Sequence, residues 1–415
     1  MRLTVTLFIL LLILTGCSVE LPIWQTENRH IRSVIITADE DHPTAIEAVV
    51  EATGPVPFAV LYAGDNITGA IYEPVVGAYL GAWLGPRMTK SDFEAKTERK
   101  HAIYTLDFTL GDEFPTTWIL QSIAAQAAPL IILRIPCSDD FPLVELAVFA
   151  HELGSYNLPA FIVFNPLPPQ SDTRPEDYVL LFRFARTMFR SYAPMAVFVW
   201  HGVDNEATPD CAFYPGHDVV DWVSIEMLAP QNAEGFIVDI PAFLMPFYLN
   251  FQQYKPVILL PIGISHFSRR DYVYRVPEAV AEIARVYASL RDSFPRVRMI
   301  VYGDHGITTP QGDDFSITKD LNTIRAYRDA ISDSHFISRL ESGGIEGPIW
   351  MRSAFHGYYY ENEILIDREI LTSINHPVPS ATTQVNERIY VNIDSVNRIQ
   401  TQVDHARQVI YLEFE

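Results

Sequence analysis

The chain has 415 residues and a formal net charge of −21, with 51 acidic against 30 basic side chains. This excess of negative charge disfavours nucleic acids and anionic polymers as ligands, since both are themselves strongly negative. A neutral polymer or a small neutral ligand fits better, although the acidity would also serve simply to keep a surface protein soluble. The length suffices for one large domain and a small one.

The N-terminus is typical of a targeting segment. Arg2 supplies a positive charge, residues 3–14 form an almost unbroken apolar run, and Leu14-Thr15-Gly16 precede Cys17 in a pattern that resembles a bacterial lipobox. The run is too short for a comfortable membrane span, so we expect its removal. The resemblance implies a signal peptide over 1–16, a diacylated Cys17 that anchors an extracytoplasmic protein to the membrane, and a tether over 17–30. An ordinary secretory signal with a chance cysteine is the alternative.

Residues 31–71 predict a small N-terminal α/β segment. Strand-like IRSVIITA is followed by helical AIEAVVEAT and strand-like VPFAVLYAG. We expect this segment to form a layer packed on the main domain.

Residues 72–335 show apolar runs of strand length that alternate with amphipathic stretches of helical length. Mostly continuous apolar strands separated by helices favour a parallel sheet covered on both faces, and eight such units fit a (β/α)8 TIM barrel. A doubly wound open sheet is the competitor, but no GxGxxG motif or P-loop follows the first strand. The expected strands are 76–83, 103–108, 130–135, 160–164, 196–200, 222–227, 257–260 and 299–302, and the clearest helices are 117–127, 143–153, 175–192 and 277–294.

The last part of the chain, residues 345–415, has the pattern of a small β domain. Its segments YYYENEILIDREI, ERIYVNI and RQVIYLEFE alternate polar and apolar residues and are separated by turn residues.

Only two cysteines follow Cys17. Cys137 and Cys211 could form one disulfide in an oxidising compartment, or remain two separate thiols, because the sequence does not give their separation. No CxxC, HExxH or dense Cys/His cluster is present, so we expect neither a metal nor a cofactor.

Five segments of the predicted barrel carry a recognisable pattern. They are VVGAYLGAW (75–83), PEDYVLLFRFARTMFR (175–190) leading into MAVFVWHGVDN (195–205), FYPGHDVVDWVSIEM (213–227), KPVILLPIGISHFSRRD (255–271) and DFSITKDLNTIRAYRDAI (314–331). Together, and in this order, they resemble glycoside hydrolase family 26, the β-mannanase type, over roughly residues 72–335.

The resemblance implies a retaining glycosidase, in which two carboxylates about 5 Å apart flank the glycosidic bond at the ends of strands four and seven. Where the family carries a His-Glu pair on strand four, this chain has Asn165-Pro166. Where it carries the nucleophilic Glu, this chain has Pro261, at which we expect strand seven to end. No Asp or Glu occurs in 161–170 or 254–270, so a small alignment shift restores neither carboxylate.

Other polar and aromatic side chains at the expected strand ends remain candidates for chemistry. If the protein is a hydrolase, Glu226 with Asp304 is the expected relocated acid pair; otherwise both bind ligand hydroxyls or cap loops and helices. Flat rings can cover the apolar faces of sugars, or they simply pack in the core, which we expect for Trp222. The further ligand-binding candidates are Tyr79, Trp83, Asn165, Trp200, His201, Asp204, His266 and His305.

Three functional hypotheses follow. The first is a surface lipoprotein whose barrel binds a neutral oligosaccharide or polysaccharide without the family's catalytic carboxylates. The second is an active glycoside hydrolase with relocated acidic residues. The third is a structural or assembly component of the cell envelope. Fold alone does not decide among them, because activity resides in the site.

Overall fold

We analysed a computed structural model of the chain. The predicted signal peptide and tether, with Cys17, lie outside the described residues, as do Cys137, Asp204 and His305. None of the helices in the described ranges is long and apolar enough to cross a membrane. The described ranges are 56–63, 69–74, 76–135, 142–166, 173–202, 211–252, 254–268, 271–304, 313–340, 351–360, 363–373, 375–385, 388–404 and 409–414.

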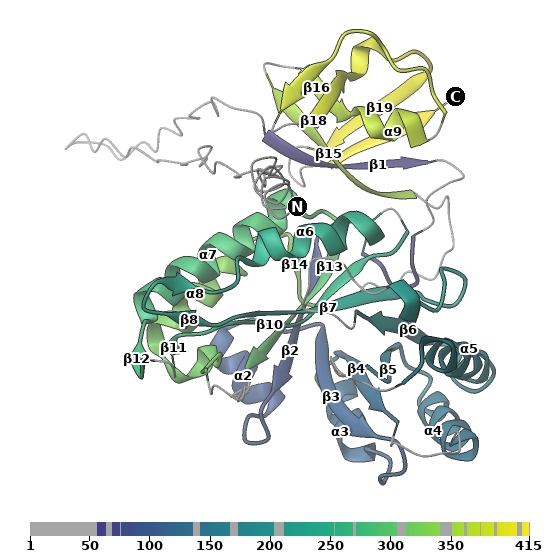
Figure 1. The fold of residues 1–415 in the computed structure, drawn as a ribbon, viewed down its shortest axis with the longest axis vertical. Helices are drawn as coiled ribbons and strands as arrows, with labels where there is room; N and C mark the ends of the chain where they lie inside the picture. The colour runs from purple at the N-terminus through teal and green to yellow at the C-terminus, as the bar shows by residue number, and fades with distance from the viewer. Residues whose placement is uncertain are drawn as a thin grey trace, which may run out of the picture.

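Eight parallel strands form a closed barrel (Figure 1). Each strand pairs with the next along the chain, and the last pairs with the first, Met299 opposite Tyr79, which closes the ring. The predicted (β/α)8 barrel is confirmed and the open sheet is wrong. The strands are β2 (Ala78–Leu84), β3 (Ile103–Thr109), β4 (Ala128–Arg134), β5 (Ala160–Phe164), β6 (Ala196–His201), β7 (Trp222–Ala229), β10 (Val257–Ile264) and β13 (Val297–Asp304), with the short β14 (Phe336–Ile337) beside β2.

Helices cover the outside of the barrel, each with an apolar stripe toward the strands. In α5, for example, Tyr178, Phe182 and Phe189 are buried at helical spacing, and its first turn carries two acidic residues that suit the helix dipole. The helices are α2 (Lys90–Thr97), α3 (Thr116–Ala124), α4 (Leu143–Ser155), α5 (Pro175–Tyr192), α6 (Ile240–Phe251), α7 (Val276–Ser293) and α8 (Leu321–Ala330).

Side chains of the barrel strands alternate between two apolar clusters, as the twofold period of a strand requires. The inner cluster fills the barrel axis and includes Tyr79, Phe161 and Trp222. The outer cluster lies between strands and helices and includes Tyr104 and Phe198. This alternation decides which residue at each strand end faces the barrel axis.

Strand β10 continues beyond the residue at which we expected it to end. It runs to Ile264, where Ile264 pairs with Ala229, so Pro261 lies inside the strand. Its pairing with both neighbours shifts between Leu259 and Ile262, and a proline is tolerated at such an irregularity because it has no N–H to donate. The C-terminal end of strand seven is therefore three residues later than predicted.

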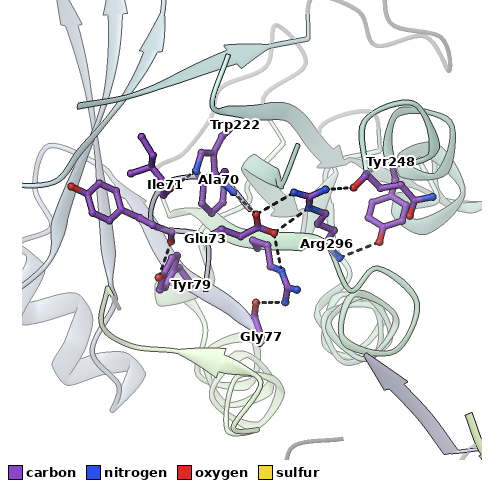
Figure 2. Close-up of polar contacts among 11 residues, drawn as sticks. Ala70, Ile71, Glu73, Gly77, Tyr79, Trp222, Tyr248 and Arg296 are labelled. Carbon is purple, nitrogen blue, oxygen red and sulfur yellow. Dashed lines mark hydrogen bonds and ion pairs between the residues drawn. The ribbon is translucent and has the colours of Figure 1, made fainter. Parts of the chain in front are cut away.

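A buried ionic cluster closes the N-terminal end of the barrel (Figure 2). Arg296 donates from Nε and Nη2 to the two carboxylate oxygens of Glu73, at 3.1 and 3.2 Å, and Nε of Arg298 lies 3.5 Å from Glu73 Oε1. The backbone N–H of Ala70 also donates to Glu73, and the Trp222 indole donates to the carbonyl of Ile71. The segment 69–74 is thereby fixed across this end.

A second, seven-stranded sheet forms the small β domain expected at 345–415. One of its strands, β1 (Val56–Ala63), comes from the N-terminal region: it pairs antiparallel with β15 and parallel with β20. Figure 1 shows this purple strand within the yellow-green sheet. The sheet order is β17 (Thr383–Val385), β18 (Arg388–Asn392), β16 (Glu363–Asp367), β15 (Met351–Tyr360), β1, β20 (Val409–Phe414) and β19 (Ile399–Asp404), with α9 (Arg368–Ser373) against it.

The predicted N-terminal layer over 31–71 is therefore wrong where the structure describes it. Phe58 and Val60 of β1 pack with Ile366, Ile410 and Leu412 of the C-terminal sheet, so the strand buries its apolar face there. Residues 69–74 belong to the closed end of the barrel instead.

Candidate functional site

Polar side chains converge on the axis at the C-terminal ends of the barrel strands, where (β/α)8 enzymes place their active sites. Strand alternation turns these residues inward. Most are partly exposed, and only Ser224 is fully buried. We call this set the rim: Trp83 on β2, Asp107 on β3, Arg134 on β4, Asn165 after β5, His201 on β6, and Ser224 and Glu226 on β7.

An ion pair forms the most defined contact of the rim. Arg134 donates from Nε to Asp107 Oδ1 at 2.8 Å and from Nη2 to Oδ2 at 2.9 Å, a bidentate arrangement. The two side chains are 45% and 35% exposed. The pair is therefore charge-balanced and accessible. Neither residue was predicted from the sequence, although each occupies the last inward-facing position of its strand.

His201 ends β6 at the same end of the barrel, within electrostatic reach of Arg134. Its Nδ1 is 2.9 Å from the hydroxyl of Ser224 on the neighbouring strand, and the two residues are register partners. Burial lowers the pKa of His201 to about 4, and the positive charge of Arg134 adds to the effect. His201 is therefore a neutral hydrogen-bonding group at neutral pH.

Glu226 brings a carboxyl group to the same end of the barrel. Burial raises the pKa of Glu226 above the ordinary range of a glutamate. Within the described ranges, no hydrogen bond or ion pair engages this side chain. Its carboxyl group is thus available to a ligand hydroxyl.

Trp83 gives the rim an aromatic surface. It is partly buried, packs against the inner cluster and pairs across to Gly303 on β13. Trp83 thus lies at the C-terminal end of β2, and its role in ligand binding stays a prediction.

Strands four and seven end without a carboxylate. At the end of strand four (β5), Asn165 has φ +40°, and its side-chain oxygen accepts the backbone N–H of Ile135. This hydrogen bond fixes the chain just after strand three (β4), and Pro166 follows Asn165. At the corrected end of β10, Ser265 donates its hydroxyl to the carbonyl of Phe267. The later end of β10 therefore does not supply the carboxylate that the resemblance led us to expect, and Asn165 supplies none at the end of β5.

Asp304 does not form the predicted pair with Glu226. It faces the outside of the barrel and accepts from Ser316 Oγ (2.9 Å) and from the backbone N–H (3.1 Å) and hydroxyl (2.6 Å) of Thr318. Its carboxylate holds the segment before α8. The acid pair is wrong, and the alternative that Asp304 caps a loop is the one observed. Asp304 lies one residue past the last inward-facing position of β13, and a single residue reverses the face of a strand.

Trp200, Tyr79 and His266 are also not at the rim. Trp200 is fully buried in the outer cluster against Phe247 and Phe251. Tyr79 lies at the closed end of the barrel, where its hydroxyl donates to the carbonyl of Tyr72. His266 is buried beside Tyr274, beyond the end of β10. Trp222 is a core residue, in agreement with the prediction.

The described residues offer no cluster of three or more His, Cys, Asp or Glu side chains arranged to hold a metal ion. Among the described residues, the rim offers hydrogen-bonding groups, one ion pair, the Glu226 carboxyl group and one aromatic surface.

No protein-family model and no curated protein matches the sequence. Among solved structures, the fold is similar to that of a modular endo-β-1,4-mannanase from Cellulomonas fimi, a glycoside hydrolase family 26 enzyme, with a TM-score of 0.51 and 12% identity over 79% of this chain and 93% of that chain. A family 26 β-mannanase from Bacteroides ovatus aligns with a TM-score of 0.46 and 9% identity over 65% and 95% of the two chains. At such identities the likeness concerns the fold: the chain has a barrel like that of a family 26 glycoside hydrolase.

Proposed function

We propose that the protein binds a neutral saccharide at the rim and does not hydrolyse it. The observation that carries the proposal is the composition of the rim, which combines one tryptophan, a charge-balanced Asp107–Arg134 pair and a neutral His201. Aromatic rings cover the apolar faces of sugars, while paired charges and neutral donors bind hydroxyl groups.

We infer that the protein does not hydrolyse the saccharide, because the described carboxyl groups at this end of the barrel do not form a pair. A retaining mechanism needs two carboxyl groups about 5 Å apart. Glu226 is one carboxyl group, but Asp304 is committed to Ser316 and Thr318, and Asp107 is committed to Arg134. Among the described residues, this end of the barrel thus supplies contacts for a sugar rather than an acid pair.

We also propose that Cys17 is lipidated and anchors the barrel outside the cytoplasm. The support is the apolar run over residues 3–14 and the lipobox-like pattern directly before Cys17. Labelling cells with a radioactive fatty acid tests this proposal, because Cys17→Ser should abolish incorporation.

Titration calorimetry with β-1,4-linked mannan oligosaccharides tests the binding proposal. We expect the full chain to bind without releasing reducing ends. Trp83→Ala should weaken binding about tenfold or more, which corresponds to the loss of one aromatic contact. Trp118→Ala removes a tryptophan that packs under Lys90 on the outside of the barrel and serves as the matched control.

Two results would contradict the proposal. Equal affinity of wild type and Trp83→Ala would remove the rim as the binding site. Release of reducing ends that Glu226→Gln abolishes would instead establish an active hydrolase with a relocated acid.

A further inference from the structure

Strongly exposed aromatic side chains lie on a hairpin beyond the end of strand seven. Tyr272 is 77% exposed, Tyr274 is 67% exposed, and Val273 between them is also exposed. Single exposed apolar residues are ordinary, but two tyrosines that are at least 67% exposed on one short hairpin are candidates for an interaction site. We call this feature the aromatic hairpin and define it as β11 (Phe267–Ser268), β12 (Val273–Tyr274) and Tyr272.

The aromatic hairpin is held in place by its neighbours. Phe267 pairs with Tyr274, their ring centroids are 4.8 Å apart, and Phe267 also forms a bridge to Asp314. The backbone N–H of Arg275 donates to the carbonyl of His266 at 2.9 Å. Because its base is fixed at both strands, the hairpin presents its rings without the entropy cost of ordering a free loop.

Tyr272 adopts an unusual backbone conformation. Its φ is +55°, a left-handed value that is uncommon for residues other than glycine and asparagine. Within the described ranges, no ring contact, hydrogen bond or ion pair engages the Tyr272 side chain. A conformation of this kind persists where the surroundings or the function require it.

The hairpin stands at the same end of the barrel as the rim. It leaves the C-terminal end of β10, and Figure 1 shows β11 and β12 at the far end of that strand. Gly263, which pairs with inward-facing Leu228, is four residues before Phe267, so the two lie at most about 14 Å apart. A ligand in the rim reaches the hairpin only if it extends beyond the rim.

We propose that the aromatic hairpin is a second saccharide subsite, where Tyr272 and Tyr274 stack on distal units of a neutral β-linked polysaccharide whose other units occupy the rim. This inference rests on the proposed function of the rim. Phenol rings offer flat, uncharged surfaces with a hydroxyl at the edge, which suits a pyranose ring. The net charge of −21 disfavours a polyanion as the occupant.

The test compares a disaccharide with a polymer on the full chain. We expect Tyr272→Ala combined with Tyr274→Ala to lower the affinity for β-1,4-mannan about tenfold and to leave the affinity for mannobiose unchanged. Tyr192→Ala is the matched control, because this exposed tyrosine ends α5 at the opposite end of the barrel. Thermal unfolding should show that all three chains are equally stable.

Failure of the hairpin and failure of the rim give different results. The hairpin is not a distal subsite if the double variant binds the polymer as tightly as wild type. The same holds if its affinity for mannobiose falls by the same factor as its affinity for the polymer. Loss of self-association with unchanged polymer affinity would make it a contact between copies and would also overturn the proposal. If the double variant loses the polymer while Trp83→Ala retains both ligands, the rim proposal fails and the hairpin remains the polymer site.

Discussion

The two ends of the barrel use the same chemistry for different purposes. At the N-terminal end, Arg296 and Arg298 contact Glu73, and all three side chains are almost completely buried. At the C-terminal end, Arg134 contacts Asp107, and both side chains are substantially exposed. Arg296 and Arg134 each bind their carboxylate through two nitrogens, at 3.1 and 3.2 Å and at 2.8 and 2.9 Å, so the main difference between these two pairs is burial.

Burial changes what an arginine–carboxylate pair can do. A buried pair binds no external ligand, and the loss of either partner leaves a charge in a medium that solvates it poorly. An exposed pair adds little to stability because water screens it, but its groups remain available to hydroxyls. The closed end is thus suited to hold the segment 69–74, and the rim is suited to bind.

Glu73→Gln should give the largest effect on stability. The substitution retains the shape of the side chain and removes the charge that both Arg296 and Arg298 contact, so we expect a loss of about 3–5 kcal/mol in the free energy of unfolding. Urea unfolding followed by tryptophan fluorescence measures it, because the Trp222 indole is bonded to the same segment through Ile71. A loss below about 1 kcal/mol would show that the closed end is no more than another surface pair.

Asp107→Asn should have a small effect on stability and a large effect on ligand affinity. The free energy of unfolding should change by less than about 1 kcal/mol, because the ion pair is exposed. The affinity for a mannan oligosaccharide should fall about tenfold, since Arg134 loses the partner that holds its guanidinium across the rim. Urea unfolding measures the stability and calorimetry the affinity of the same variant. If Asp107→Asn destabilised the fold as strongly as Glu73→Gln, the two ends of the barrel would not differ in the way proposed.

The barrel was predictable because its strands are nearly continuous apolar runs separated by helical patterns. All eight expected strands are present. The error at β10 came from Pro261, since a proline usually ends a central strand and here lies at an irregularity in the pairing. The error at β1 had another cause: its partners, β15 and β20, lie roughly 300 residues away in sequence, and local patterns do not report such a pairing.

The position of the rim at the strand ends could be predicted from the sequence, but the residues that form it could not. The sequence shows which residues end the strands, but a shift of one residue decides whether a side chain faces the axis or the helices. Trp200 and His201 are neighbours, yet Trp200 packs outside and His201 faces inward. Counting in twos from the inner residues of β3 and β4, Ile103 and Leu130, would have found Asp107 and Arg134.

The smallest expected effect concerns the proton affinity of His201. Burial is the larger cause of its low pKa and Arg134 the smaller, so Arg134→Ala should raise the pKa from about 4 but keep it below the ordinary value of about 6.5. NMR titration of the imidazole protons measures this shift, and Arg134→Lys, which retains the charge, is the control. If the pKa of His201 stayed at about 4 in Arg134→Ala, the charge of Arg134 would not influence the protonation of His201.

The same shift has a consequence for stability. Because the folded state lowers the pKa of His201, the unfolded chain takes up the proton first, and the stability that this group contributes is lost as the pH falls from about 6.5 toward 4. Arg134→Ala should raise the folded-state pKa of His201 toward the unfolded-state value of about 6.5. The variant should therefore lose less stability than wild type between pH 6.5 and pH 4. An exposed ion pair would then influence the protonation of the rim more than the stability of the fold, whereas the buried pair at the other end does the reverse.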